Sequence, residues 1–504
     1  MSPQPRASRA LLRGTVIYGI GAVIPRLGVF LLLPVYTLGM GSAEFGVFAL
    51  MLSLAGLLTL LVRLGLDGAL LRLHYDVEET RRGRLYWTAA TITVGAGAVL
   101  AIVLLPLAGP LFDVVFPGIA VVPYGVLAVA IAALAALHYI PATHFRATDR
   151  PGRFVALGIA MVGVAAIATL WLVLGVHLGA LGGLVGQLAG AGIVVIVGGA
   201  VVVRLRPIGF DVAAARSGLA FGLPLVPHSI AGWVLNLSDR WLIGLLIGLP
   251  AIAAQQWVGI YSLGYQLGQV VALVALALNT AWVPFFYARG EGPDGPALLR
   301  EMSSLSIGAL AVLAVLVGVL APDIVALLAP PAWGPDAATA GVVAPLVAMA
   351  SLAQGVYLMA VSPLFLRRRT AVLPLLTAAA AAANVGLNAL LIPRLGVVGA
   401  GWATIAGYGV LALGTAWYAR RGYPLRLDLT RLSALLIGAA AAIVAARSVS
   451  PPEPLPGVLV HLAVAGGFAL LVLPAVRGPL RRARRLVDAP APVPPLAGSP
   501  DETV

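Results

Sequence analysis

Long apolar runs follow one another along the whole chain, and short polar segments separate them. Fourteen runs reach the length of a bilayer-spanning helix, which needs roughly 20 apolar residues. They cover residues 14–38, 45–71, 86–109, 121–142, 154–176, 179–203, 217–248, 255–288, 302–321, 338–362, 371–392, 396–418, 429–446 and 456–476. The first run is too long for a signal peptide and lacks a small-x-small cleavage site, so we expect it to be retained. The pattern predicts an all-α polytopic membrane protein with about 14 transmembrane helices.

Composition supports this prediction. Hydrophobic residues make up 61% of the 504 positions and charged residues 10%. Soluble domains carry roughly 25% charged residues, so a surface this poor in charge suits lipid and not water. The chain has no cysteine, which excludes disulfides, thiol catalysis and cysteine-ligated metals.

The arginines give the orientation. All 32 basic residues are Arg, and 27 of them lie in alternate connections and at the two ends, whereas the other connections hold only Arg394 and Arg447. Cytoplasmic loops are rich in Lys and Arg, so we predict an even number of spans in a bacterial cytoplasmic membrane, with both termini in the cytoplasm. Because topology accounts for the net charge of +13, we expect no nucleic-acid partner.

Motifs for catalysis or cofactor binding are missing from the sequence. The six His residues are scattered without ligand spacing, and no GxxxxGK[ST] phosphate loop is present. No loop exceeds about twenty residues, which leaves no room for a soluble catalytic domain. We therefore predict that the protein is not an enzyme and needs no metal or other cofactor. Residues 478–504 are predicted to form a disordered, proline-rich cytoplasmic tail.

Five charged residues lie within the apolar runs: Arg26, Arg63, Asp67, Asp239 and Arg240. Each costs at least ~2.5–3.5 kcal/mol near the bilayer centre, so such residues face a protein interior or a watery cavity. Arg63 and Asp67 are four positions apart, so on one helix they share a face; they form either a functional pair or a self-neutralising one. Asp239 and Arg240 are adjacent and point in different directions. Arg240 is either a cavity residue or an anchor at the membrane interface.

The surplus of Arg over Asp favours an anionic ligand, because the guanidinium fork matches phosphate oxygens. We therefore predict a cationic substrate site of Arg26, Arg63 and Arg240, with Asp67 and Asp239 in charge pairing or coupling. Uncharged polar residues also occur at depth, either lining the cavity or bonding helices together: Asn236, Gln266, Gln269 and Asn279, with Gln187, Asn384 and Asn388. Pro224 and Pro227 are predicted to break the seventh run. Trp282, Tyr261 and Tyr287 are interpreted as packing or interface residues.

An ordered set of short motifs resembles the Wzx-like polysaccharide flippases of the multidrug/oligosaccharidyl-lipid/polysaccharide exporter superfamily. The segments are Phe221–Pro227 with Trp233, Asn236 and Ser238–Arg240; Gly259–Ser262; Ala281–Tyr287; Asn384, Asn388 and Ile392–Thr404; and Pro34–Thr37, Glu44–Gly46 and Leu64–Asp67. The last two helices match by position only.

This resemblance implies two six-helix lobes, 1–203 and 204–420, around a central cavity, with two additional helices in 421–477. It implies a polyprenyl-pyrophosphate-linked oligosaccharide as substrate, moved by alternating access, with membrane lipids and glycan polymerases or glycosyltransferases as partners. An intramembrane Arg in the eighth helix, part of the family pattern, is missing here.

Two other functions stay open. A small-molecule or drug cation antiporter of the same fold would use an acidic cavity and depend on Asp67 or Asp239. A non-transporting membrane scaffold for a glycan-assembly complex would tolerate neutralisation of all five buried charges. A membrane glycosyltransferase would need loop chemistry that the sequence lacks.

Overall fold

The apolar runs fold as helices in the computed structural model, which describes residue 28 and residues 30–424, 428–449 and 454–488. Thirteen helices of the described part are long and apolar enough to cross a membrane. They coincide in order with the second to fourteenth predicted runs, and no strand occurs among the described residues. The first run lies mostly outside the described residues. The disordered tail predicted for residues 478–504 is wrong for residues 478–488, which continue the last helix, and residues 489–504 lie outside the described residues.

The elements follow in chain order. The first half holds α2 (Leu33–Gly39), α3 (Ser42–Arg63), α4 (Leu66–Asp76), η1 (Glu79–Arg81), α5 (Arg82–Val115), η2 (Val121–Gly125), α6 (Val126–Ala136), α7 (Tyr139–Ala147), α8 (Pro151–Leu170), η3 (Trp171–Gly175), α9 (Gly179–Arg204) and α10 (Val212–Gly222). The second half holds η4 (Leu223–Leu225), α11 (Val226–Leu246), α12 (Ala251–Arg289), α13 (Gly295–Leu328), η5 (Pro331–Trp333), η6 (Pro335–Ala338), α14 (Thr339–Leu366), η7 (Thr370–Val372), α15 (Leu373–Leu395), α16 (Val397–Ala419), α17 (Leu429–Val449) and α18 (Pro454–Asp488).

Local sequence explains where helices begin and break. Glu44 accepts a hydrogen bond from the Gly41 backbone N–H at 3.2 Å and so satisfies one of the free donors at the start of α3. The predicted proline break in the seventh run is confirmed, because Pro224 lies in the short turn η4 between α10 and α11.

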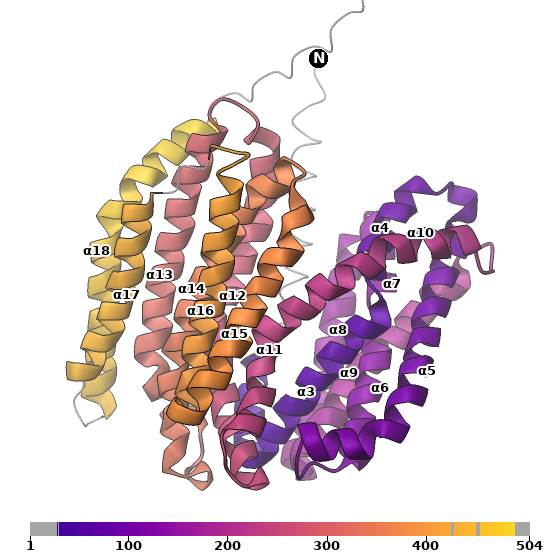
Figure 1. Ribbon diagram of the computed structural model, residues 1–504, viewed down its shortest axis with the longest axis horizontal. Helices are drawn as coiled ribbons and strands as arrows, with labels where there is room; N and C mark the ends of the chain where they lie inside the picture. The colour runs from indigo at the N-terminus through magenta and orange to yellow at the C-terminus, as the bar shows by residue number, and fades with distance from the viewer. Residues whose placement is uncertain (1–27, 29, 425–427, 450–453, 489–504) are drawn as a thin grey trace, which may run out of the picture.

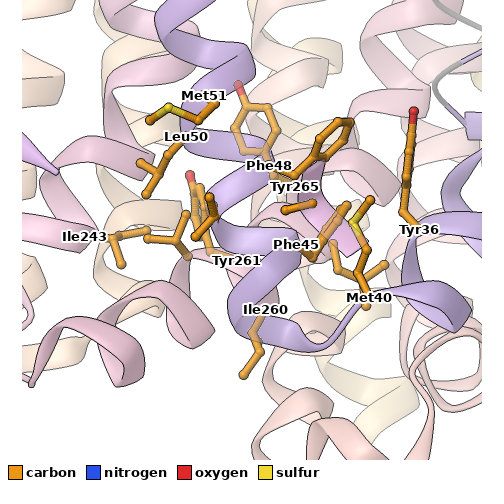
Figure 2. Close-up of a cluster of buried hydrophobic side chains, with 14 of the residues drawn as sticks. Tyr36, Met40, Phe45, Phe48, Leu50, Met51, Ile243, Ile260, Tyr261 and Tyr265 are labelled. Carbon is orange, nitrogen blue, oxygen red and sulfur yellow. The ribbon is translucent and has the colours of Figure 1, made fainter. Parts of the chain in front are cut away.

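The helices form two groups, which lie together at one end and spread apart toward the other (Figure 1). We call the spread end, with segments 72–84, 146–153, 204–216 and 289–300, the arginine-rich face, and the opposite end the arginine-poor face. Helices α3, α11 and α12 join the groups. Figure 2 shows buried side chains from both groups at this junction, among them Tyr36, Phe45, Phe48, Ile243 and Ile260. Since lipid is as apolar as these side chains, close packing stabilises the junction more than removal from water does.

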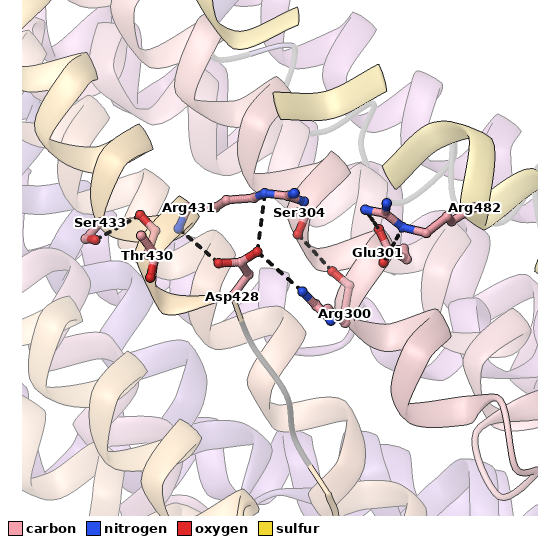
Figure 3. Close-up of polar contacts among 8 residues, drawn as sticks. All are labelled: Arg300, Glu301, Ser304, Asp428, Thr430, Arg431, Ser433 and Arg482. Atoms are coloured by element: carbon pink, nitrogen blue, oxygen red, sulfur yellow. Dashed lines mark hydrogen bonds and ion pairs between the residues drawn. The ribbon is translucent and has the colours of Figure 1, made fainter. Parts of the chain in front are cut away.

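Charged contacts at the arginine-rich face fasten the last two helices to α13. The Arg482 guanidinium on α18 donates two hydrogen bonds to Glu301, at 2.8 and 3.0 Å (Figure 3). Asp428, just before α17, forms ion pairs with Arg431 at 3.2 Å and with Arg300 of α13 at 3.6 Å. The bidentate geometry makes the Arg482–Glu301 pair the strongest of these contacts.

The arginine-poor face carries a second set of such contacts. His461 Nδ1 on α18 lies 2.6 Å from Asp323 Oδ2 on α13. Arg447 on α17 donates to the Gly341 carbonyl of α14 at 2.7 Å. Fastened at both faces, α17 and α18 form one unit with α13 and α14.

Candidate transport site

The Asp239 carboxylate is the centre of a polar network inside the second helix group. Its side chain is fully buried. Tyr261 Oη of α12 donates to Oδ2 at 2.6 Å, Thr404 Oγ1 of α16 donates to the same oxygen at 2.8 Å, and Asn388 Nδ2 of α15 donates to Oδ1 at 2.8 Å. Four helices therefore contribute to one carboxylate. An ionised carboxylate only accepts hydrogen bonds, so this set of donors stabilises the charged form against the cost of burial.

Helix periodicity brings the amides of this network together. Asn384 and Asn388 are four positions apart on α15 and so share one face of the helix, where Asn388 Nδ2 also donates to Asn384 Oδ1 at 3.1 Å. Thr404 Oγ1 lies 2.9 Å from the Ala400 carbonyl one turn earlier. Two hydroxyls and one amide N–H thus donate to the Asp239 carboxylate, and two of these three groups also contact a second acceptor.

Arg240 points away from Asp239, as expected for adjacent helix positions. Its guanidinium carbon lies 4.4 Å from the centre of the Tyr265 ring, and its Nη1 lies 3.5 Å from the Asn236 carbonyl. Asn236 is held in turn, since its carbonyl accepts from Tyr265 Oη at 2.7 Å and its side-chain oxygen accepts from Tyr408 Oη. Arg240 is 5% exposed, so it belongs to the interior of the second group and is not an interface anchor. A cation over an aromatic ring contributes about 2 kcal/mol when desolvated.

Arg63 and Asp67 do not share one helix face, so this prediction is wrong. Helix α3 ends at Arg63, Leu64 and Gly65 adopt left-handed backbone conformations, and Asp67 lies in the first turn of α4. The Arg63 guanidinium instead donates to the carbonyls of Ala135 at 2.9 Å and Ala136 at 3.3 Å. These are the last carbonyls of α6, where a cation is favourable for the helix dipole. Asp67 is exposed, and within the described ranges no ion pair joins it to Arg63.

The remaining predicted residues are distributed as follows. Arg26 lies outside the described residues. Gln266, Gln269 and Asn279 are partly buried on α12. In the described part of the chain, Gln266 Oε1 and Asn279 Oδ1 have no hydrogen-bond partner. Gln187 on α9 donates to Tyr36 Oη at 3.1 Å, which is the helix-bonding role considered for it.

Three tryptophans close the arginine-poor half of the junction. Trp333 of the α13–α14 connection donates its indole N–H to the Met40 carbonyl at 2.9 Å, and its ring lies 5.7 Å from that of Phe45. Trp233 and Trp241 of α11 donate to Ser53 of α3, at its carbonyl (3.0 Å) and its Oγ (2.6 Å). All three donors belong to the second group and all acceptors to the first. The contacts between the groups are therefore specific hydrogen bonds as well as packing.

Glycines permit the closest approach of helices in this closure. A Cβ on Gly46 of α3 would meet the Gln255 carbonyl oxygen at 1.9 Å, and a Cβ on Gly259 of α12 would meet the Ser42 carbonyl oxygen at 2.0 Å. Only glycine fits at this crossing, where small residues let membrane helices touch.

Sequence reasoning missed part of this arrangement. Tyr261 was interpreted as a packing residue, yet its hydroxyl bonds Asp239. Thr404, Trp233 and Trp333 were given no role. Tyr261, Thr404 and Trp233 lie within or beside the family-like motifs, which was the one available signal. In the described residues, no group of three or more His, Cys, Asp or Glu could hold a metal.

Comparisons with known proteins give the fold and the family. Residues 11–288 match the family described as "Polysaccharide biosynthesis protein". A structure titled "Lipid II flippase MurJ, inward closed conformation" has a TM-score of 0.67 and 12% identity and covers 94% of this chain and 100% of its own. An inward-facing multidrug resistance MATE family transporter of the MOP superfamily has a TM-score of 0.59, 15% identity and coverage of 84% and 98%.

A further MOP superfamily transporter, from Pyrococcus furiosus, has a TM-score of 0.57 and 16% identity and covers 84% of this chain and 96% of its own. That transporter is described as having a binding pocket of reverse polarity. No match was found among curated protein sequences. The structural likeness, at these low identities, establishes the two-group fold of a membrane transporter.

Proposed function

Since the chain belongs to the polysaccharide biosynthesis protein family, we propose that it is a flippase that moves a polyprenyl-pyrophosphate-linked oligosaccharide across the cytoplasmic membrane by alternating access. One observation carries the proposal. The two helix groups are bonded together at the arginine-poor face and spread apart at the arginine-rich face. A transporter that opens to one side at a time needs such a one-sided closure.

The arginine-rich face is the cytoplasmic side in this proposal. Arg-rich loops stay in the cytoplasm during insertion, and the arginines of segments 72–84, 146–153 and 367–369 all lie at this face. The lobes then open toward the leaflet in which lipid-linked glycans are assembled. We propose that both termini lie in the cytoplasm.

The pyrophosphate is the part of the cargo that the chain can recognise by charge. Within the described residues, neither Arg63 nor Arg240 has a carboxylate in ion-pair contact, and neutral carbonyls and a ring hold them instead. Phosphate oxygens are stronger acceptors than these neutral partners. We propose that Arg63 and Arg240, with Arg26, bind the pyrophosphate when the cargo enters, and that Gln266, Gln269, Asn236 and Asn279 line its path.

Asp239 is the proposed coupling residue. It is a buried carboxylate with hydrogen bonds from α12, α15 and α16, so a change in its protonation or the binding of a small cation would alter the packing of three helices at once. Asp67, exposed on α4, is a second acidic residue that coupling could use. The membrane potential acting on the cargo would add ~2.3 kcal/mol per charge per 100 mV.

The test is glycan export by charge-removing variants. We expect Arg240→Gln and Arg63→Gln each to lower export about tenfold or more, because hydrogen bonds to charged groups contribute about 1.5–3 kcal/mol. Arg394→Gln is the matched control, since Arg394 is exposed and bonds its own helix at the Leu390 carbonyl. Normal export by both variants, at normal membrane levels, would rule out the cationic site.

Two alternatives give different outcomes. A small-molecule antiporter of the same fold would depend on Asp239 or Asp67 and be indifferent to Arg63 and Arg240. The buried Asp239 network is the observation that favours it. A scaffold for a glycan polymerase or glycosyltransferase complex would keep its function when Arg26, Arg63, Asp67, Asp239 and Arg240 are all neutralised.

A further inference from the structure

Helix α10 and the segment before it pack on the first helix group, although they begin the seventh membrane span. The contacts of α10 are with α4 and α5, besides the turn η4 that follows it. Ala214 of α10 shares an apolar cluster with Leu66, Leu70 and Leu85 of these helices. Figure 1 shows α10 lying across α4, away from the helices of the second group.

Polar contacts fix the same segment to α5 and the turn before it. Asp211 accepts a hydrogen bond from Arg81 Nη2 at 2.6 Å and caps α10 by accepting from the Ala214 backbone at 3.1 Å. The Asp211 backbone N–H donates to Thr88 Oγ1 at 2.8 Å, and the Trp87 indole donates to the Leu205 carbonyl at 3.3 Å. The Asp211 side chain is 7% exposed and the Arg81 side chain 51% exposed, so water partly screens this ion pair, and the backbone hydrogen bonds of Asp211 share in holding the segment.

The crossing of α10 with the α3–α4 break allows no added atoms. A Cβ on Gly65 would meet the Gly222 carbonyl oxygen at 2.2 Å, and a Cβ on Gly222 would meet the Leu64 carbonyl oxygen at 2.5 Å. Next to this crossing, Arg72 of α4 places its guanidinium carbon 5.4 Å from the centre of the Phe221 ring of α10. Backbone contact and side-chain contact therefore hold the end of α10 in the first group.

Helix α11, in contrast, packs mainly with the second helix group. Leu235 packs with Ala380, Tyr408 and Leu411 of the second group, and Asp239 bonds three of its helices. Between α10 and α11 lie η4 and Pro224, and Pro227 follows at the start of α11. Prolines remove backbone hydrogen bonds, so the chain can bend here at low cost.

We propose that α10 moves with the N-terminal lobe, so that the mobile boundary between the lobes is the hinge at residues 222–227 and not the start of the seventh span. The Arg81–Asp211 pair is the clasp that keeps α10 in place. This inference rests on the proposed function in one respect, that the two lobes rock against each other. In this arrangement the seventh span connects the two lobes throughout transport, with α10 in the N-terminal lobe and α11 in the C-terminal lobe.

Distances between spin labels in proteoliposomes test the inference, and the absence of native cysteines leaves a clean background. One label pair, Ala213→Cys with Gly152→Cys, joins α10 to the exposed start of α8 in the first group. The other, Ala213→Cys with Leu375→Cys, joins α10 to α15 of the second group, where Leu375 is 70% exposed. We expect a single distance for the first pair and two populations for the second.

A crosslink provides the control for rocking. Cysteines at Gly118 and Ala251 lie at the arginine-poor face in different groups, and a Cβ on Gly118 would be 2.8 Å from that of Ala251. Joining them should reduce the second pair to one population, and reductant should restore both. A clasp variant, Asp211→Asn, should broaden the first distance, whereas Asp76→Asn, in an exposed pair with Arg72, should not.

The outcomes separate the two proposals. If the first distance changes and the second stays constant, α10 belongs to the C-terminal lobe, and the inference fails while alternating access stands. If both distances stay constant with and without the crosslink, the lobes do not rock, and the proposed function fails together with the inference. A constant first distance in the Asp211→Asn variant removes the role of the clasp.

Discussion

Arg63 in the first helix group is half-buried and Asp239 in the second is fully buried, and the two charges are stabilised in opposite ways. Arg63 is held by main-chain carbonyls at the end of a single helix, α6. Asp239 is held by side chains from α12, α15 and α16. The first arrangement is local and survives if the lobe moves as a body. The second depends on four helices keeping their positions, so it responds to any change in how the C-terminal lobe is packed.

This difference predicts unequal costs of removing the two charges. A buried hydrogen-bond donor left without its partner costs about 1–3 kcal/mol. Loss of the Asp239 carboxylate removes three hydrogen bonds and leaves the buried Tyr261 hydroxyl without its acceptor, although Thr404 and Asn388 each keep a second one. Loss of the Arg63 guanidinium leaves two carbonyls that can accept from water at a helix end.

The largest effect is expected for Asp239→Ala. The free energy of unfolding should fall by about 3 kcal/mol, since three hydrogen bonds to a charged group are lost and Tyr261 keeps no acceptor. Equilibrium unfolding in mixed detergent micelles measures it. Asp239→Asn keeps the volume and one oxygen, so it should fold and still lose transport. Asp67→Asn, at an exposed position, is the control for the stability measurement. Equal stability of Asp239→Ala and wild type would contradict the structural role of the network.

A smaller effect is expected for Arg63→Gln, about 1–2 kcal/mol by the same measurement, because fewer and weaker bonds are lost. The exposed Arg394→Gln should be close to neutral. If Arg63→Gln destabilises the protein as much as Asp239→Ala does, the local account of Arg63 is wrong. Transport should nevertheless fall in Arg63→Gln, which separates its proposed role in binding from its role at the helix end.

The sequence predicts the membrane spans and contacts within one helix, but not the side chains that surround Asp239. Thirteen spans follow from apolar length, because lipid forces every backbone group to bond within its own helix. The Asn384–Asn388 contact follows from helix periodicity alone. The partners of Asp239 could not be predicted, since Tyr261 and Thr404 lie 22 and 165 positions away and reach it through tertiary packing.

The Arg63–Asp67 prediction failed for a local reason. It assumed an unbroken helix, whereas Leu64 and Gly65 turn left-handed. Gly65 is the signal for that turn, because glycine adopts positive φ without strain. A leucine at φ 51° has no such signal, and contact with Gly222 of another helix explains why the break lies there.

The third prediction concerns the closure that joins the two lobes. Trp333→Phe replaces the indole by a smaller aromatic ring and removes the hydrogen bond to the Met40 carbonyl, worth about 1 kcal/mol. The population open at the arginine-poor face should rise about fivefold. The rate of thiol modification at Ala254→Cys, a position 3% exposed, measures it. Trp402→Phe is the control, because Trp402 is 51% exposed. An unchanged rate would show that the Trp333 bond does not hold the closure.

The smallest effect concerns pH and the carboxyl of Asp211, which lies at the arginine-rich face. The Ala214 backbone hydrogen bond, and then Arg81, hold the pKa of Asp211 below its usual range. A carboxyl with a lowered pKa stabilises the folded contact above its ordinary pKa of ~3.9 and loses that contribution as pH falls through the lowered value. Docking of α10 should therefore be the same at pH 7 and pH 5, by the Ala213–Gly152 label distance, and weaken only in stronger acid. A change between pH 7 and pH 5 that persists in Asp211→Asn would assign it to another group, while one abolished by that substitution would contradict the lowered pKa.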